Sequence, residues 1–143
     1  MSPVAVFFYG SYLNRDVLAD VELRPERWEP TRLAGYRLEI RPLANLVLDP
    51  TALAYGILAE ADHAQLERLY THAREVLGGV YWPHPVLVES LERPGFEPAL
   101  CYIADALAPG PADPAYVERI LGPARSYGFP EPYLAHIASF APG

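Results

Sequence analysis

The chain has 143 residues, a length that suits one domain spanning residues 1–143. Its formal net charge is −7 and all 11 basic residues are arginines without a basic run, which argues against nucleic-acid binding, because phosphate contacts need clustered positive charge. No apolar run reaches the roughly 18 residues of a membrane span, and no signal-peptide pattern opens the chain, so we expect a cytoplasmic protein.

Residues up to 61 are expected to form short strands separated by turns, since short apolar runs alternate there with Gly and Pro. Strands are predicted at 4–9, 32–40, 44–48 and 54–59. Ser11 is expected to cap a short helix over 13–19, and 20–31 is expected to be a loop. The turn signal Asp49-Pro50 separates the third strand from the fourth.

The clearest helix of the sequence follows. Asp62 supplies a capping side chain, apolar residues recur at helical spacing from Leu66 to Leu77, and Gly78-Gly79 ends the pattern. Two strands at 85–90 and 99–104 are then expected to pair across a turn-rich stretch at 93–95.

The C-terminal part is expected to be helical. After a Pro-rich linker at 108–114, Asp113 and Pro114 form a typical helix start. Pro123 is expected to kink or break this helix near Gly122, and a last short helix is expected over 131–140. Strands followed by helices predict an α+β fold and exclude regular βαβ alternation.

Three ordered stretches carry a family resemblance: Phe8-Tyr9-Gly10-Ser11-Tyr12-Leu13, then 74–81 (Arg-Glu-Val-Leu-Gly-Gly-Val-Tyr), and 116–133, which is preceded by a strand-like run at 99–103. They resemble the gamma-glutamyl cyclotransferase-like family over nearly the whole chain. The resemblance implies a mixed, barrel-like β-sheet of short strands with a few flanking helices.

The resemblance also implies an activity in glutathione metabolism, a lyase-type reaction without cofactor or metal. The α-amine of a small gamma-glutamyl substrate attacks its own side-chain carbonyl, and 5-oxoproline and an amine, amino acid or peptide are released. Glu75 is implied as the catalytic base and then acid, because one carboxylate can carry the proton in both directions. The implied substrate-binding residues are Tyr9, Gly10, Ser11, Tyr12, Leu13, Tyr81 and Tyr116.

Two features of the residues keep a catalytically inactive binding module open as the alternative. Tyr12 stands where the family usually has Asn. On a helix continuing from Leu66, Glu75 would point opposite the apolar face. Glu67 and Glu89 are the other candidate carboxylates.

Further alternatives are weaker. An interaction domain that uses the Tyr- and Pro-rich tail after residue 108 is one of them. His72 and Glu75 have the spacing of a metal-ligand pair but lack a third ligand. Cys101 is the single cysteine and lies in an apolar run, so we expect a buried structural thiol. Dimerisation stays open.

Overall fold

The structure is a computed structural model and describes residues 3–141. Five strands form a closed barrel in the order β1-β3-β2-β4-β5, which confirms the predicted α+β fold with a barrel-like sheet. The strands are β1 (Val4–Phe8), β2 (Trp28–Ile40), β3 (Ala44–Ala61), β4 (Trp82–Ser90) and β5 (Phe96–Ile103). The helices are η1 (Ser11–Leu13), α1 (Arg15–Ala19), α2 (His63–His72), η2 (Ala73–Leu77), α3 (Pro114–Ser126) and α4 (Glu131–Ala138).

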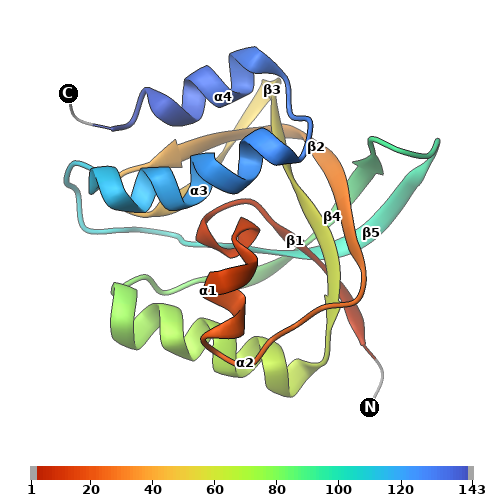
Figure 1. Ribbon diagram of the computed structural model, residues 1–143, viewed down its shortest axis with the longest axis horizontal. Coiled ribbons are helices and arrows are strands. Elements are labelled where there is room, and N and C mark those ends of the chain that lie inside the picture. Colours follow the sequence, from red (N-terminus) through yellow and green to blue (C-terminus); the bar gives the residue numbers. More distant parts are fainter. Residues whose placement is uncertain (1–2, 142–143) are drawn as a thin grey trace.

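The barrel is built on a long antiparallel hairpin of β2 and β3. β1 pairs antiparallel with β3 and then parallel with β5, through Val6↔Leu100 and Phe7↔Cys101. In Figure 1, α3 and α4 (blue) lie on one side, α2 (green) lies on the opposite side, and α1 (red) lies between them. The segment from β1 to α1 therefore sits between the two helical layers, where the candidate site is found.

The predicted turn at Asp49-Pro50 is wrong as a strand end, because β3 continues through it. Leu48 pairs with Tyr36 and Leu53 pairs with Ala34, so residues 49–52 bulge out opposite a single residue of β2. The turn chemistry is present locally, since the Asp49 carboxylate accepts a hydrogen bond from the Thr51 backbone N–H at 3.0 Å. Pairing on both sides of the bulge keeps the strand in one piece.

Two further strand boundaries differ from the prediction. β2 begins at Trp28, so the expected loop at 20–31 ends earlier than predicted. β4 begins at Trp82 although it contains Pro83 and Pro85. Both prolines pair with residues of β5, whereas β4 pairs with β2 only near the end of β4. The N–H groups that the prolines lack therefore interrupt no hydrogen-bond ladder between β4 and β2.

The predicted helix over 62–77 forms, with a local change of winding. Asp62 and Gln65 make a reciprocal capping box, with bonds of 2.7 Å and 2.9 Å. The last turn, η2, winds as a π-helix and ends at Gly78, whose φ of 83° suits glycine. Leu66, Leu69 and Ala73 are buried against the barrel, as the apolar spacing predicts.

Asn14 explains two departures at once. It caps α1 by accepting a hydrogen bond from the Asp16 N–H at 3.0 Å, so the prediction of Ser11 as the cap is wrong. Pro123 lies inside an unbroken α3, contrary to the predicted break. Pro123 cannot donate to the Arg119 carbonyl one turn earlier, and the Asn14 amide donates to that carbonyl instead, at 3.2 Å.

The C-terminal helices pack against the barrel and share its core. Tyr116, Val117 and Ile120 of α3 are buried, as are Tyr133 and Ile137 of α4. Residues 114–138 therefore do not form a detachable tail. None of the helices among residues 3–141 is both long and apolar enough to cross a bilayer.

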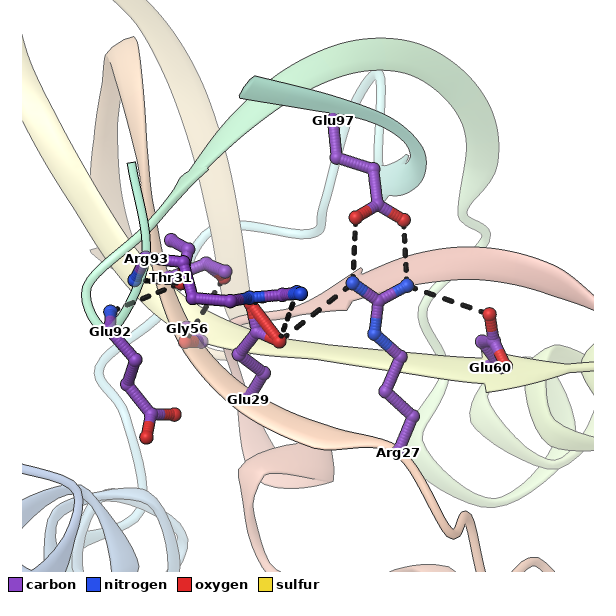
Figure 2. A network of polar contacts seen from close by, with 9 residues as sticks. Arg27, Glu29, Thr31, Gly56, Glu60, Glu92, Arg93 and Glu97 are labelled. Carbon is purple, nitrogen blue, oxygen red and sulfur yellow. Dashed lines mark hydrogen bonds and ion pairs between the residues drawn. The ribbon is translucent and has the colours of Figure 1, made fainter. Parts of the chain in front are cut away.

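A network of ion pairs ties three strands together (Figure 2). Arg27, just before β2, makes two hydrogen bonds of 2.6 Å to Glu97 of β5 and lies 3.5 Å from Glu60 of β3. Glu29 bridges Arg27 and Arg93, with its closer contact, 2.8 Å, to Arg93. The network adds side-chain links between strands that are not neighbours in the barrel.

Candidate functional site

A small cavity of about 30 Å³ lies where η1, α2 and α3 meet the barrel. Six of the seven predicted substrate-binding residues line it, whereas Leu13 is fully buried in the core next to it. Its lining residues are Phe8, Tyr9, Gly10, Ser11, Tyr12, Ala44, Tyr70, Ala73, Leu77, Tyr81, Tyr102 and Tyr116.

The peptide groups of Ala44, the first residue of β3, hold two of the cavity tyrosines. The Ala44 N–H donates to the Tyr116 hydroxyl at 3.0 Å, and the Tyr81 hydroxyl donates to the Ala44 carbonyl at 2.6 Å. Residues from three distant parts of the chain are thus fixed to one point. The Tyr116 hydroxyl keeps its own hydrogen, which makes it a potential donor in the cavity.

Two other cavity tyrosines are also anchored to backbone carbonyls. Tyr9 donates to Tyr102 O at 2.6 Å, and Tyr12 donates to Leu69 O at 3.0 Å. Tyr12 therefore ties η1 to α2 in a way that the shorter Asn of the family pattern cannot copy. Its hydroxyl serves the structure of the loop.

Burial keeps the cavity tyrosines neutral. Desolvation raises the pKa of Tyr9, Tyr12, Tyr70 and Tyr81 well above the ordinary value for a phenol, and it raises the pKa of Tyr116 as well. Neighbouring phenols add to the shift of the first four. At neutral pH these groups donate hydrogen bonds and do not act as bases.

The loop at Gly10 approaches β3 closely. A Cβ atom at Gly10 would lie 2.7 Å from the Cβ of Ala44, so only glycine allows this approach without a shift. η1 starts at Ser11 and no side chain caps its first N–H groups. Free N–H groups at a helical turn favour a carboxylate or a developing oxyanion.

Tyr70 and Tyr102 form a wall on one side of the cavity. Their rings stack with centroids 3.8 Å apart, and Tyr70 also meets Tyr12 edge-on at 5.5 Å. Outside the wall lies a second, larger hollow of about 360 Å³. Tyr70, Tyr81 and Tyr102 line both spaces, so the two spaces adjoin across these side chains.

The candidate carboxylates lie outside the cavity. Glu75 is exposed on η2, while Ala73 and Leu77 on either side of it line the cavity. Glu89 forms a 2.7 Å ion pair with Arg32 on the barrel. Glu67 lines the outer hollow.

The predicted His72–Glu75 pair gains no third ligand. Among residues 3–141, no group of three or more His, Cys, Asp and Glu side chains is arranged to hold a metal ion. Cys101 is fully buried behind the cavity, and burial raises the pKa of its thiol, as expected for a structural cysteine.

Tyr70, Tyr102 and Ala44 are among the lining residues that the site prediction does not include. Tyr70 belongs to the apolar face of the predicted helix, and helical spacing alone does not distinguish it from the core residues of that face. Tyr102 alternates with Cys101 and Ile103, a period of two that places it on the other side of β5. No local signal marks Ala44, because its role depends on the loop that approaches it.

Comparisons with known proteins give the fold. No family model and no curated protein matches the sequence. Among solved structures, one named gamma-glutamyl cyclotransferase superposes with a TM-score of 0.79 at 20% identity, covering 99% of this chain and 90% of the other. An uncharacterized protein from Homo sapiens reaches a TM-score of 0.84 at 18% identity, with 100% and 90% covered.

A yeast structure described as a gamma-glutamyl cyclotransferase specific to glutathione is also similar. Its TM-score is 0.69 at 15% identity, and the match covers 98% of this chain and 96% of the other. At these identities the likeness establishes architecture over the full described length and leaves the reaction open. The chain has the gamma-glutamyl cyclotransferase-like fold.

Proposed function

We propose that this protein binds a small gamma-glutamyl compound in the cavity between η1 and α2. The observation that carries the proposal is the lining itself: the Tyr116 hydroxyl, which keeps its own hydrogen, and the Gly10–Ser11 loop, whose N–H groups no side chain caps, border a space that no carboxylate lines. Such a lining offers hydrogen-bond donors to the carboxylate or carbonyl of a ligand. It offers no base.

Binding requires a movement of the wall. A space of 30 Å³ holds about one or two water molecules, and a gamma-glutamyl group is larger. Tyr81 is fixed by its bond to Ala44, whereas Tyr70 is held through ring contacts with Tyr12, Tyr81 and Tyr102. Rotation of the Tyr70 side chain would join the cavity to the outer hollow.

The second candidate function is gamma-glutamyl cyclotransferase activity. The neighbours with this name and the matching Tyr9-Gly10-Ser11 loop favour it. In this reaction the α-amine bonds to the γ-carbonyl carbon, the amide C–N bond breaks, and the proton lost by the ammonium group goes finally to the leaving amine. Glu75 or Glu67 would have to carry that proton, a step worth about 10²–10⁴-fold in rate.

One experiment separates the two candidates. The purified protein is titrated with γ-glutamylalanine by calorimetry, and the same mixture is assayed for 5-oxoproline by mass spectrometry. Binding without 5-oxoproline supports the binding module, and turnover supports the cyclotransferase. A folded protein that neither binds nor converts this compound, glutathione or a gamma-glutamyl amine would refute both.

Variants test the residues. Tyr116→Phe removes one hydroxyl donor from the cavity and should weaken binding roughly 2- to 12-fold. Tyr36→Phe on β2 lies outside the cavity lining and should bind like the wild type. Glu75→Gln should leave γ-glutamylalanine binding unchanged. A loss of 5-oxoproline formation by several orders of magnitude in Glu75→Gln or in Glu67→Gln would favour the cyclotransferase.

A further inference from the structure

The hairpin of β4 and β5 carries an apolar face on its outer side. Along both strands, buried residues alternate with residues that point away from the barrel interior. Five apolar residues of this outward set form what we call the arm face: Pro85, Leu87, Phe96, Pro98 and Leu100. Leu87 is 61% exposed and Phe96 is 68% exposed, so the centre and one end of the face are open to solvent.

The hairpin projects from the barrel as an arm, which is why the face lacks cover. In Figure 1 the end of the hairpin (green to teal) extends beyond the other strands. β4 pairs with β2 only through Glu89 and Ser90, and no other strand among residues 3–141 pairs with β4 on that side. The α2–η2 segment covers the outer side of β5 at Tyr102, whose ring stacks on Tyr70. The apolar surface continues along both strands past this helical cover.

Charge does not oppose the approach of a second copy at this face. The chain carries a net charge of −7, but the arm face contains no charged residue. Glu89, the carboxylate beside Phe96, is paired with Arg32 at 2.7 Å. Two arm faces can therefore meet without bringing unpaired carboxylates together, whereas a strongly charged partner would find no complementary charge on the face.

The arrangement of the face fits a two-fold axis through the paired residues Leu87 and Pro98. Rotation about this axis lays the large Phe96 ring of one arm over the end of the other arm where Pro85 and Leu100 are paired. Each copy then offers the same surface and receives the same surface, as in an isologous dimer. Pro83 and Pro85 lack an N–H group, which disfavours strand addition at the open edge of β4, so the copies would pack face to face.

The size of the arm face is appropriate for a small homodimer. At the exposures of its five residues, it presents roughly 400 Å² of apolar surface. A standard interface takes about 800 Å² from each partner, and about 65% of it is apolar in homodimers. The arm face would supply most of that apolar share, which predicts a dissociation constant in the micromolar range.

We propose that this protein forms a two-fold homodimer in which the arm faces of two copies pack against each other. The inference goes beyond the proposed function and does not depend on it. It assigns a role to an apolar face that neither the cavity nor the outer hollow uses.

Sedimentation equilibrium on the full chain tests the proposal. From about 1 to 300 μM, the average mass should rise from the 15.8 kDa of one chain toward twice that value. Leu87→Glu should weaken the dimer at least roughly 100-fold, because Leu87 lies at the axis and two carboxylates would meet there. Leu48→Glu is the matched control, since Leu48 is 78% exposed on β3 outside the arm, and this variant should associate like the wild type. A wild type that stays monomeric over this range overturns the proposal.

A cysteine cross-link tests the position of the axis with a milder substitution. After oxidation with copper phenanthroline, Leu87→Cys should form a disulfide-linked dimer on a non-reducing gel, whereas Leu48→Cys should remain a single chain. Cys101 is buried, so it should not contribute to the cross-link. Equal cross-linking at both positions, or a dimer of unchanged affinity in a folded Leu87→Glu variant, overturns the arm face as the interface. Binding of a monomeric wild type to phosphatidylcholine vesicles would also overturn it, in favour of a lipid surface.

Discussion

Replacement of Asn14 should show that one amide group supports two helices. In Asn14→Ala, α1 loses its cap, which is worth about 0.5–2 kcal/mol. The Arg119 carbonyl loses its donor, which is worth roughly 0.5–1.5 kcal/mol. Both bonds are near the surface, at 3.0 Å and 3.2 Å, so we expect a loss of roughly 1–3 kcal/mol in the free energy of unfolding.

A second variant separates the two contributions. Asn14→Asp keeps an acceptor for the Asp16 N–H but has no amide hydrogen for the Arg119 carbonyl. It should therefore lose only about 0.5–1.5 kcal/mol. In a Pro123→Ala background the new N–H at position 123 can donate to that carbonyl, so Asn14→Asp should cost less there than in the wild type.

Urea denaturation followed by circular dichroism gives the four free energies of this cycle. The reasoning is refuted if Asn14→Asp costs the same in both backgrounds, because the amide then does not replace the hydrogen bond that Pro123 removes. Equal losses in Asn14→Ala and Asn14→Asp would show that the cap contributes nothing.

Three further predictions concern the loop, the ion pairs and the thiol. Gly10→Ala places a methyl group 2.7 Å from a methyl carbon of β3 and should lower the free energy of unfolding, measured by urea denaturation, by about 1–3 kcal/mol. Gly110→Ala, which has open space around it, should be neutral. Equal stabilities of the two variants would contradict the close approach. The hydrogen bond from Arg27 lowers the pKa of Glu97 below its ordinary 4.5. The ion pair therefore stabilises the fold above about pH 4.5, and this stabilisation is lost as the pH falls through the lower folded-state pKa of Glu97. Arg27→Met should flatten this part of a Tm-against-pH curve, and an unchanged slope would argue against the ion pair. Burial raises the pKa of the Cys101 thiol, so iodoacetamide at pH 8 should label this cysteine only when urea unfolds the chain. Mass spectrometry follows the labelling. Rapid labelling of the native protein would contradict the burial of Cys101.

Signals that act within a few residues were predictive. Asp62 and Gly78 delimit their helix as expected, and Asp113 caps α3 by accepting from the Ala115 N–H at 2.9 Å. In each case the group that satisfies the helix end lies within a few residues of it, so the local sequence is enough to predict the contact. The fold class followed from such elements in order.

Failures occurred where a distant partner compensates for a local rule. Pro123 does not break α3, because Asn14 satisfies the carbonyl that it leaves free. Asp49-Pro50 does not end β3, because β2 pairs with both sides of the bulge. Periodicity within one element cannot reveal a partner that belongs to another.

The candidate site was predictable in part for the same reason. The loop around Tyr9 and Gly10 lines the cavity, and Tyr81 and Tyr116 line the same cavity. Helical spacing predicts that Glu75 faces away from the apolar side of its helix, and the Glu75 side chain is exposed. Tyr70 is held at the cavity by its stacking with Tyr102 of β5, a contact that no spacing in the sequence encodes.

The Tyr127 hydroxyl donates to the Leu13 carbonyl at 2.7 Å, across 114 positions of the chain. During synthesis at about 5–20 residues per second, the loop therefore waits roughly 6 to 23 s for this partner. Until α3 leaves the ribosome, the tyrosines that follow β1 lack the cover that α3 gives them and expose apolar ring surface. The candidate site is thus among the last parts of the molecule to assemble, and a nascent chain stalled before residue 114 should not bind γ-glutamylalanine.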